Sequence, residues 1–168
     1  MPFNKVKIYN QLLDLLSLGE KERITSLKGV FNRDFKNNTL TFQQRIVYPT
    51  PKENGEIPMD TLFRHLTTVM TDKVTRTREF EMDRSIRLHW VRFHLNQNKT
   101  SNMLLFSVKE PEGIRTYYYD SDEKYVIILE PLRKTDAYYL ITAYYLKGKD
   151  AMRNKIEKKY IRRLDKVY

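Results

Sequence analysis

Four short strand-like runs, joined by connections of only a few residues, most constrain how this chain can fold. The runs cover residues 103–108, 114–119, 125–130 and 138–146. The segments at 110–113 (Glu-Pro-Glu-Gly) and 120–123 (Asp-Ser-Asp-Glu) have the composition of tight turns. Because such connections leave no room for crossover helices, the runs predict a four-stranded, mostly antiparallel sheet.

Helical patterns surround the predicted sheet, so the expected fold class is α+β. Apolar spacing of three or four residues predicts helices over residues 3–18, 79–96 and 150–164, while residues 22–36 fit a helix less well because Gly29 interrupts them. Residues 39–48 alternate as a half-buried strand does. We expect the helix over 79–96 to pack on the sheet, with Met82, Ile86, Trp90 and Phe93 facing inward.

A proline-rich segment divides the chain. Residues 49–58 contain three prolines and one glycine, which is typical of a loop or a boundary. We therefore predict an accessory segment over residues 1–57 and a functional domain over residues 58–168.

Composition excludes several classes of protein. The 168 residues include no cysteine, which excludes a disulfide scaffold, a zinc finger and a thiol nucleophile. There is no glycine-rich phosphate loop, no metal-binding histidine pair, no secretion signal and no apolar run near 18 residues, so we expect no cofactor, no membrane association and a cytoplasmic location. The net charge of +10 favours a polyanionic partner.

His89 is the first candidate for chemistry. On a regular helix it lies about 20° from Met82 and about 60° from Ile86, at the edge of the inward face. From there it either projects into a cleft beside the sheet or lies at the edge of the core, bonded to a backbone carbonyl.

Two hydroxyl groups on the last strand are the second candidate. Strand alternation places Thr142 and Tyr144 on one face, about 7 Å apart, a spacing that suits a phosphate. The alternative is that both residues are there as good strand formers.

The end of the chain is strongly basic. Residues 147–168 contain nine Lys or Arg and three acidic residues. Clustered cations and tyrosines suit a nucleic-acid backbone and its bases, although a charged run is also typical of a solvated helix face.

The order of these motifs resembles a known superfamily. Arg-x-x-Arg-x-His-Trp at 84–90 is followed by Tyr-Val-Ile-Ile-Leu-Glu at 125–130, Tyr-Tyr-Leu-Ile-Thr-Ala-Tyr-Tyr at 138–145 and a basic run at 153–163. Together they resemble the phage-associated and polymorphic-toxin branches of the barnase–EndoU–colicin–RelE-like (BECR-fold) ribonucleases, over roughly residues 60–163. Phe63-Arg64-His65-Leu66 also belongs to this similarity, and residues 1–57 lie outside it.

The resemblance implies a metal-independent endoribonuclease with a helix packed on a four-stranded antiparallel sheet, acting on RNA such as tRNA, with an immunity or antitoxin protein as a partner. Such cleavage needs a base for the 2′-hydroxyl, an acid for the leaving 5′-oxygen and cations for the phosphate. The expected catalytic residues are His89, Thr142, Tyr144, Arg87, Arg115 and His65. Glu130 is a weaker candidate for the base, and Arg84, Lys158, Lys159, Arg162 and Arg163 are expected to bind the RNA backbone.

Two alternative functions would use the same basic tail. A non-catalytic nucleic-acid-binding module would use the basic tail and the tyrosines without depending on His89. A phage or mobile-element docking protein would bind an acidic protein through the tail. We therefore expect His89, Thr142 and Tyr144 to meet in one cleft if the protein is a ribonuclease of this kind.

Overall fold

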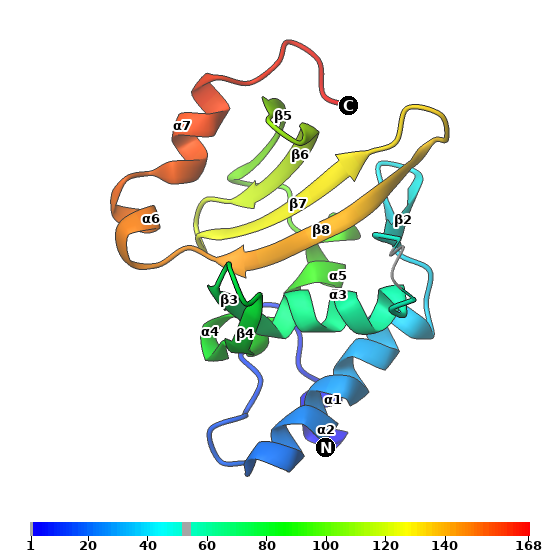
Figure 1. Ribbon diagram of the computed structural model, residues 1–168, viewed down its shortest axis with the longest axis vertical. Coiled ribbons are helices and arrows are strands. Elements are labelled where there is room, and N and C mark those ends of the chain that lie inside the picture. The colour runs from blue at the N-terminus through cyan, green and yellow to red at the C-terminus, as the bar shows by residue number, and fades with distance from the viewer. Residues whose placement is uncertain (1, 52–54) are drawn as a thin grey trace.

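A curled six-stranded sheet forms the centre of the molecule (Figure 1). The computed structural model describes residues 2–51 and 55–168 of the chain. The strand order is β1-β2-β8-β7-β6-β5. The strands are β1 (Thr41–Phe42), β2 (Arg45–Pro49), β5 (Met103–Glu110), β6 (Gly113–Asp120), β7 (Tyr125–Pro131) and β8 (Ala137–Tyr145).

The four predicted strands are confirmed as the antiparallel series β5, β6, β7 and β8. The fold class α+β is also confirmed, but the sheet is not the expected four-stranded one. β2 pairs in parallel with β8, with Ile46 opposite Ala137, and β1 pairs antiparallel with β2. Alternation over residues 39–48 predicted strand structure there, but a partner about 90 residues away leaves no local signal in the sequence.

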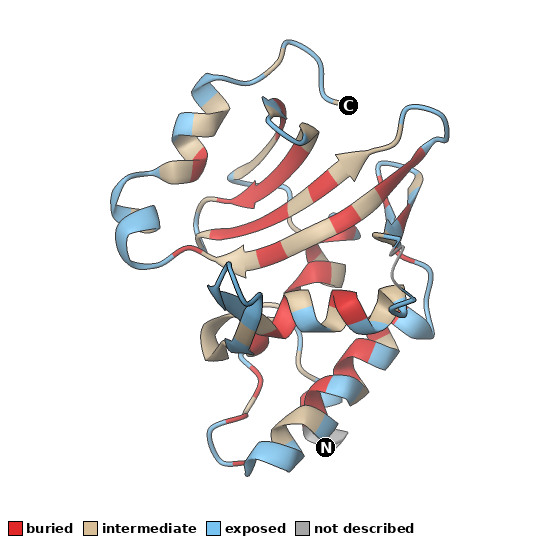
Figure 2. Ribbon diagram, viewed as in Figure 1, coloured by how far each residue is buried: buried red, intermediate tan, exposed pale blue. Residues whose placement is uncertain are grey.

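Each face of the sheet buries its own apolar cluster (Figure 2). The larger cluster includes Tyr125, Ile127 and Leu140 of the sheet and packs against helices and the N-terminal segment. The smaller one includes Phe106 and Val126 and is covered by α7 (Lys155–Ile161) through Ile156. Strand alternation produces this division, because neighbouring residues of a strand point to opposite faces.

The N-terminal segment is not the predicted helix over 3–18. Only α1 (Pro2–Lys5) is helical, and the chain then runs as an irregular strap. Leu13 donates its amide to the Ile86 carbonyl at 3.0 Å, and the Tyr9 hydroxyl donates to Asp120 at 2.5 Å. Leu13 and Leu15 are buried while Leu12 and Leu16 are exposed. Tertiary contacts therefore replace the helix that the apolar spacing predicted.

The predicted helix over 79–96 is also wrong as a single element. β4 (Thr77–Phe80) pairs with β3 (Thr68–Asp72) in a separate hairpin, followed by α4 (Met82–Ser85) and α5 (Trp90–Leu95). Between these helices the amides of Arg87, Leu88 and Trp90 bond carbonyls three residues earlier. Three residues per turn instead of 3.6 changes the angular position of every later side chain. Trp90 is nevertheless buried, as predicted.

The remaining helices flank the sheet. α2 (Glu20–Phe31) continues into the π-helical η1 (Asn32–Lys36), and α3 (Pro58–Thr67) lies along β8. The predicted basic helix over 150–164 is split into α6 (Gly148–Met152) and α7, because Asn154 adopts a left-handed conformation with φ of 49°.

Residues on both sides of the predicted boundary at 57 contribute to the larger core cluster. Leu27 and Val47 come from the first part, and Leu62 and Leu140 come from the second. The parallel pairing of β2 with β8 also joins the two parts in one sheet.

Candidate functional site

His89 lies in the layer that packs against the larger core cluster. It is 3% exposed, and its Nε2 donates to the Ile8 carbonyl at 3.0 Å. Burial lowers the pKa of His89 to about 4, so the ring is neutral at pH 7. This is the arrangement of a core-edge histidine bonded to a backbone carbonyl.

Thr142 and Tyr144 lie on the opposite face of the sheet. Ile128 pairs with Thr142 while Leu129 pairs with Leu140, so Ile141 forms a β-bulge. The bulge changes the alternation: Leu140 packs in the larger cluster, and Tyr144 packs against the smaller one. His89 therefore does not share a cleft with Tyr144, and the expected convergence is wrong in this structure. The regular helix assumed for residues 79–96 gave His89 the wrong direction.

The other predicted catalytic residues are also dispersed. The Arg87 guanidinium lies 4.0 Å from the Tyr145 ring centroid and donates to the Asp83 carbonyl at 2.7 Å. Arg115 pairs with Glu130 at 3.4 Å. His65, on α3, lines a small separate cavity beside Leu140.

Of the predicted RNA-binding residues, four belong to the basic tail. Lys158, Arg162 and Arg163 are exposed, but Lys159 is directed to Glu110, with which it forms an ion pair. The Arg163 guanidinium lies 4.1 Å from the Tyr160 ring centroid. The tail therefore presents three of these four cations to solvent.

Arg84 and Tyr144 do meet, in an open cavity of about 430 Å³ at the end of β8. We call it the Arg84 pocket. Its lining comes from β3, the start of α4, the end of β8, α6 and α7: Val69, Glu81, Arg84, Tyr144, Tyr145, Lys147, Asp150 and Lys155.

Local turns bring the tail back over this end of the sheet. Gly148 has φ of +59°, a conformation that favours glycine, and it lets the chain turn into α6 directly after β8. The left-handed Asn154 then makes a second turn, and Lys155 becomes the first residue of α7. These two turns place Lys147 and Lys155 beside Tyr144.

The Arg84 guanidinium is held rigidly. Nη1 donates to the carbonyls of His65 at 2.7 Å and Thr68 at 3.0 Å, and the guanidinium carbon lies 5.4 Å from the Tyr144 ring centroid. Its Nε is buried without a hydrogen-bond partner among the described residues. Burial lowers the pKa of Arg84 and raises that of Tyr144, so the phenol keeps its proton at neutral pH.

The lysines of the pocket are paired with carboxylates. Lys147 lies 2.6 Å from Glu81 and 2.7 Å from Asp83, and hydrogen bonds to Asp83 and Glu81 raise its pKa. Lys155 lies 3.4 Å from Asp150, and its Nζ is 6.0 Å from the Tyr144 ring centroid. Three cations, two carboxylates and two tyrosines thus line the cavity, and the Tyr144 phenol can donate a proton.

Glu81 was not predicted as a site residue, and Lys147 and Lys155 were predicted only as part of the basic tail. Lys147 lies two residues past the end of the last strand, which was the available signal, but Lys155 lies ten residues past it and is brought back only by the turns at Gly148 and Asn154. Glu81 follows β4 with no motif around it, so only the tertiary structure places it here.

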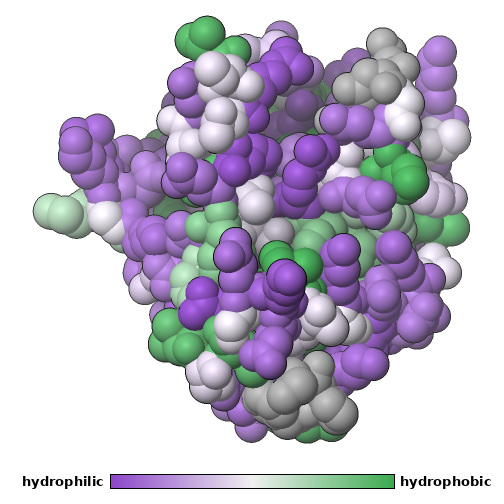
Figure 3. Space-filling model, turned by 60° about the horizontal axis from the view of Figure 1, so that its bottom comes forward, coloured by the Kyte–Doolittle hydropathy of each residue, from purple (hydrophilic) through white to green (hydrophobic). Residues whose placement is uncertain are grey.

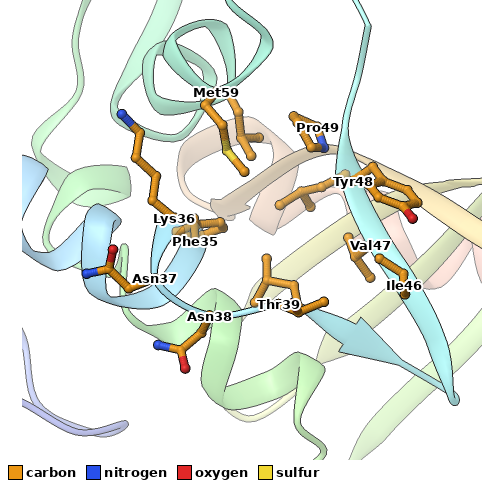
Figure 4. Close-up of a pocket in the computed structure, with 13 residues that line it drawn as sticks. Phe35, Lys36, Asn37, Asn38, Thr39, Ile46, Val47, Tyr48, Pro49 and Met59 are labelled. Atoms are coloured by element: carbon orange, nitrogen blue, oxygen red, sulfur yellow. The ribbon is translucent and has the colours of Figure 1, made fainter.

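A second cavity, of about 250 Å³, is mostly apolar (Figure 4). It lies between η1, β2 and α3, with Phe35, Val47 and Leu62 in its wall. Asn37 and Asn38 direct their amide groups away from Met59 (Figure 4). Because its polar groups do not converge, this cavity offers no catalytic arrangement.

Comparison with known proteins identifies no relative: no family model, no curated protein and no solved structure matches the chain. Within the described residues, no helix has the length and apolarity to cross a membrane. The same part of the chain contains no group of three or more His, Asp or Glu residues arranged to hold a metal ion.

Proposed function

We propose that the protein is a metal-independent endoribonuclease whose site is the Arg84 pocket. The observation that carries the proposal is the meeting of Arg84, Lys147 and Lys155 with Glu81 and Tyr144 around one open cavity. Together these side chains supply a proton acceptor, a proton donor and cations for a phosphate, which is the set that metal-free RNA cleavage needs. His89 has no role in this site.

Each group has a defined part in the reaction. The scissile phosphate binds between Arg84 and Lys155, and Glu81 accepts the proton of the 2′-hydroxyl after Lys147 turns to the phosphate. The 2′-oxygen forms a bond to phosphorus while the bond from phosphorus to the 5′-oxygen breaks. Tyr144 gives its proton to that oxygen, the flanking cations stabilise the phenolate, and the products are a 2′,3′-cyclic phosphate and a 5′-hydroxyl.

The RNA backbone continues along α7. This helix begins at Lys155 in the pocket; Lys158 is exposed on it, and the exposed Arg162 follows directly after its end. Cations on consecutive turns suit consecutive phosphates, and they make binding depend strongly on salt. The net charge of +10 supports the same kind of partner.

The test is cleavage of total RNA by the purified protein in EDTA, with mapping of the product ends. Glu81→Gln removes the proton acceptor and should lower the cleavage rate about 10²- to 10⁴-fold. Glu79→Gln, an exposed carboxylate two residues away, is the matched control and should leave the rate unchanged. RNA with a 2′-deoxy group at the mapped site should not be cut. Equal rates for the two variants would refute this site.

A non-catalytic RNA-binding module is the second candidate. The ion pairs of Lys147 with Glu81 and Asp83 favour it, because they neutralise the proposed base in the free protein. Under this alternative Lys155→Gln weakens RNA binding, and neither the unmodified protein nor any of its variants cleaves the RNA. Binding without any cut ends, measured with the same RNA, would therefore select this function over the first.

A further inference from the structure

Another cavity, on the other side of the molecule from the smaller core cluster, has the features of a separate ligand site. It has a volume of about 430 Å³ and lies between the N-terminal strap, η1 and α5. We call it the His89 pocket. Its lining is Lys5, Val6, Lys7, Ile8, Tyr9, Arg33, Asp34, His89, Arg92, Phe93, Asn96 and Asn98.

The charge of the His89 pocket is positive. Its one carboxylate, Asp34, is 2% exposed and is bound by Arg33 at 2.6 Å, with Arg92 at 3.8 Å. Within residues 2–51 and 55–168, neither Lys5 nor Lys7 forms an ion pair. The cavity therefore has cationic charge that no carboxylate of its own balances, which favours an anionic ligand.

The histidine in the wall adds a second requirement. A carbonyl only accepts hydrogen bonds, so the Nε2 that contacts the Ile8 carbonyl carries the proton. Nδ1 of the neutral ring is then an acceptor, and it is buried without a hydrogen-bond partner. A buried acceptor without a partner costs free energy unless a donor reaches it. A ligand that brings an N–H or O–H group as well as an anion therefore complements both the histidine and the cations of the cavity.

An aromatic pair forms another part of the wall. Tyr9 and Phe93 stack with ring centroids 4.4 Å apart and an angle of 9° between their planes. Asn96 and Asn98 also line the cavity and supply amide groups. Flat apolar rings beside amides and cations are typical of sites that hold a base and its phosphate.

We propose that the His89 pocket binds a nucleoside phosphate with an amino group on its base. The amino group donates to His89 Nδ1, the base lies against the Tyr9–Phe93 pair, and the phosphate lies among Lys5, Lys7 and Arg92. This chemistry occurs both in a free nucleotide and at the end of an RNA chain. The proposal is independent of the ribonuclease function, because no residue of the Arg84 pocket takes part.

The probe is AMP, titrated into the full chain and followed by the ¹⁵N signals of the histidine rings. Saturable binding should shift the His89 Nδ1 resonance in the direction of a hydrogen-bonded acceptor. Purine riboside 5′-monophosphate lacks the amino group, so it should bind about tenfold more weakly and leave Nδ1 unshifted. Inorganic phosphate and adenosine should each bind more weakly than AMP.

Variants separate the contributions. Arg92→Gln and Lys7→Gln should each weaken AMP binding about tenfold, while Lys21→Gln, an exposed lysine on α2 outside the cavity, should not change it. His89→Gln should remove the preference for AMP over purine riboside 5′-monophosphate. A short RNA ending in adenosine, compared with AMP, shows whether the ligand is a chain end or a free nucleotide.

Three results would overturn the proposal. The first is the absence of saturable AMP binding. The second is equal affinity for AMP and inorganic phosphate, which would leave only a general anion site. The third is an unshifted Nδ1 resonance at saturation with AMP, since the base would then not contact His89.

Discussion

Replacing Asp120 with asparagine should strongly destabilise the protein, because the carboxylate is buried and holds several hydrogen bonds. The Asp120 side chain is fully buried. It accepts hydrogen bonds from the Tyr9 hydroxyl at 2.5 Å, from Lys99 at 2.5 Å and from the amides of Asp122 at 3.1 Å and Glu123 at 3.2 Å. His94 Nε2 lies 3.3 Å from the same carboxylate.

The size of the effect follows from these contacts. A hydrogen bond to a charged group contributes about 1.5–3 kcal/mol, and asparagine loses the charge and one of the two accepting oxygens. Two such bonds lost or weakened cost about 3 kcal/mol. With a denaturant slope of about 2 kcal/mol per molar, the urea midpoint should fall by about 1.5 M.

Asp122→Asn is the matched control. Asp122 also pairs with Lys99, at 3.0 Å, but its side chain is 49% exposed. An exposed ion pair contributes little to stability because solvent screens it, so the control should lower the urea midpoint much less than Asp120→Asn does. Equal midpoints for the two variants would refute the reasoning, because burial would then not decide the effect.

The pH dependence of the free energy of unfolding gives a second test of the role of Asp120. Burial alone would raise the pKa of Asp120, but the contacts with His94, Lys99 and Tyr9 lower it well below its usual value. The folded state therefore gains stability from this carboxylate above pH about 4, and it loses that gain as the pH falls further. The Asp120→Asn variant should lose less stability between pH 5 and pH 2 than the unmodified protein, as measured by urea unfolding. If the variant and the unmodified protein lost the same stability between pH 5 and pH 2, Asp120 would not be the group responsible.

Three further predictions concern the core, the tail and a turn. Trp90→Ala should lower the free energy of unfolding by about 3–5 kcal/mol, because the ring is 2% exposed and packs on Tyr125; a loss below about 1 kcal/mol in urea unfolding would contradict this packing. Neutralising Lys158, Arg162 and Arg163 together should reduce the salt slope of RNA binding by about two, measured by fluorescence anisotropy; an unchanged slope would place the backbone contacts elsewhere. Gly113→Ala should cost about 1–3 kcal/mol in thermal or urea unfolding, since the φ of +127° is accessible almost only to glycine; an unchanged stability would show that the turn can rearrange.

The surface that surrounds these sites is mostly hydrophilic. Figure 3 shows hydrophilic residues around smaller hydrophobic areas on one face. Exposed apolar residues also occur singly among charged ones, as with Val74 at the tip of the β3–β4 hairpin and Met152 in α6. Single exposed apolar residues are normal on protein surfaces and need no binding partner to explain them.

Local patterns were enough to predict the four antiparallel strands. Each of these strands pairs with the next along the chain through a short connection, so composition and alternation hold the necessary information. The burial of Trp90 and the basic character of the tail were predicted for the same reason: both are properties of residues close together in the sequence. Arg84 and Tyr144 were also chosen from the sequence, and they do line one cavity.

Only the tertiary structure decided the rest, because it depends on contacts between distant residues. β2 joins β8 across about 90 residues. The strap over 8–15 is irregular rather than helical because its side chains and amides find partners in the segment 86–94 and at Asp120. The break between α4 and α5 turned His89 toward Ile8, and the bulge at Ile141 changed the alternation of β8. A one-residue change in periodicity moves a side chain to another face, and no pattern of residue types in this chain specifies where such a change occurs.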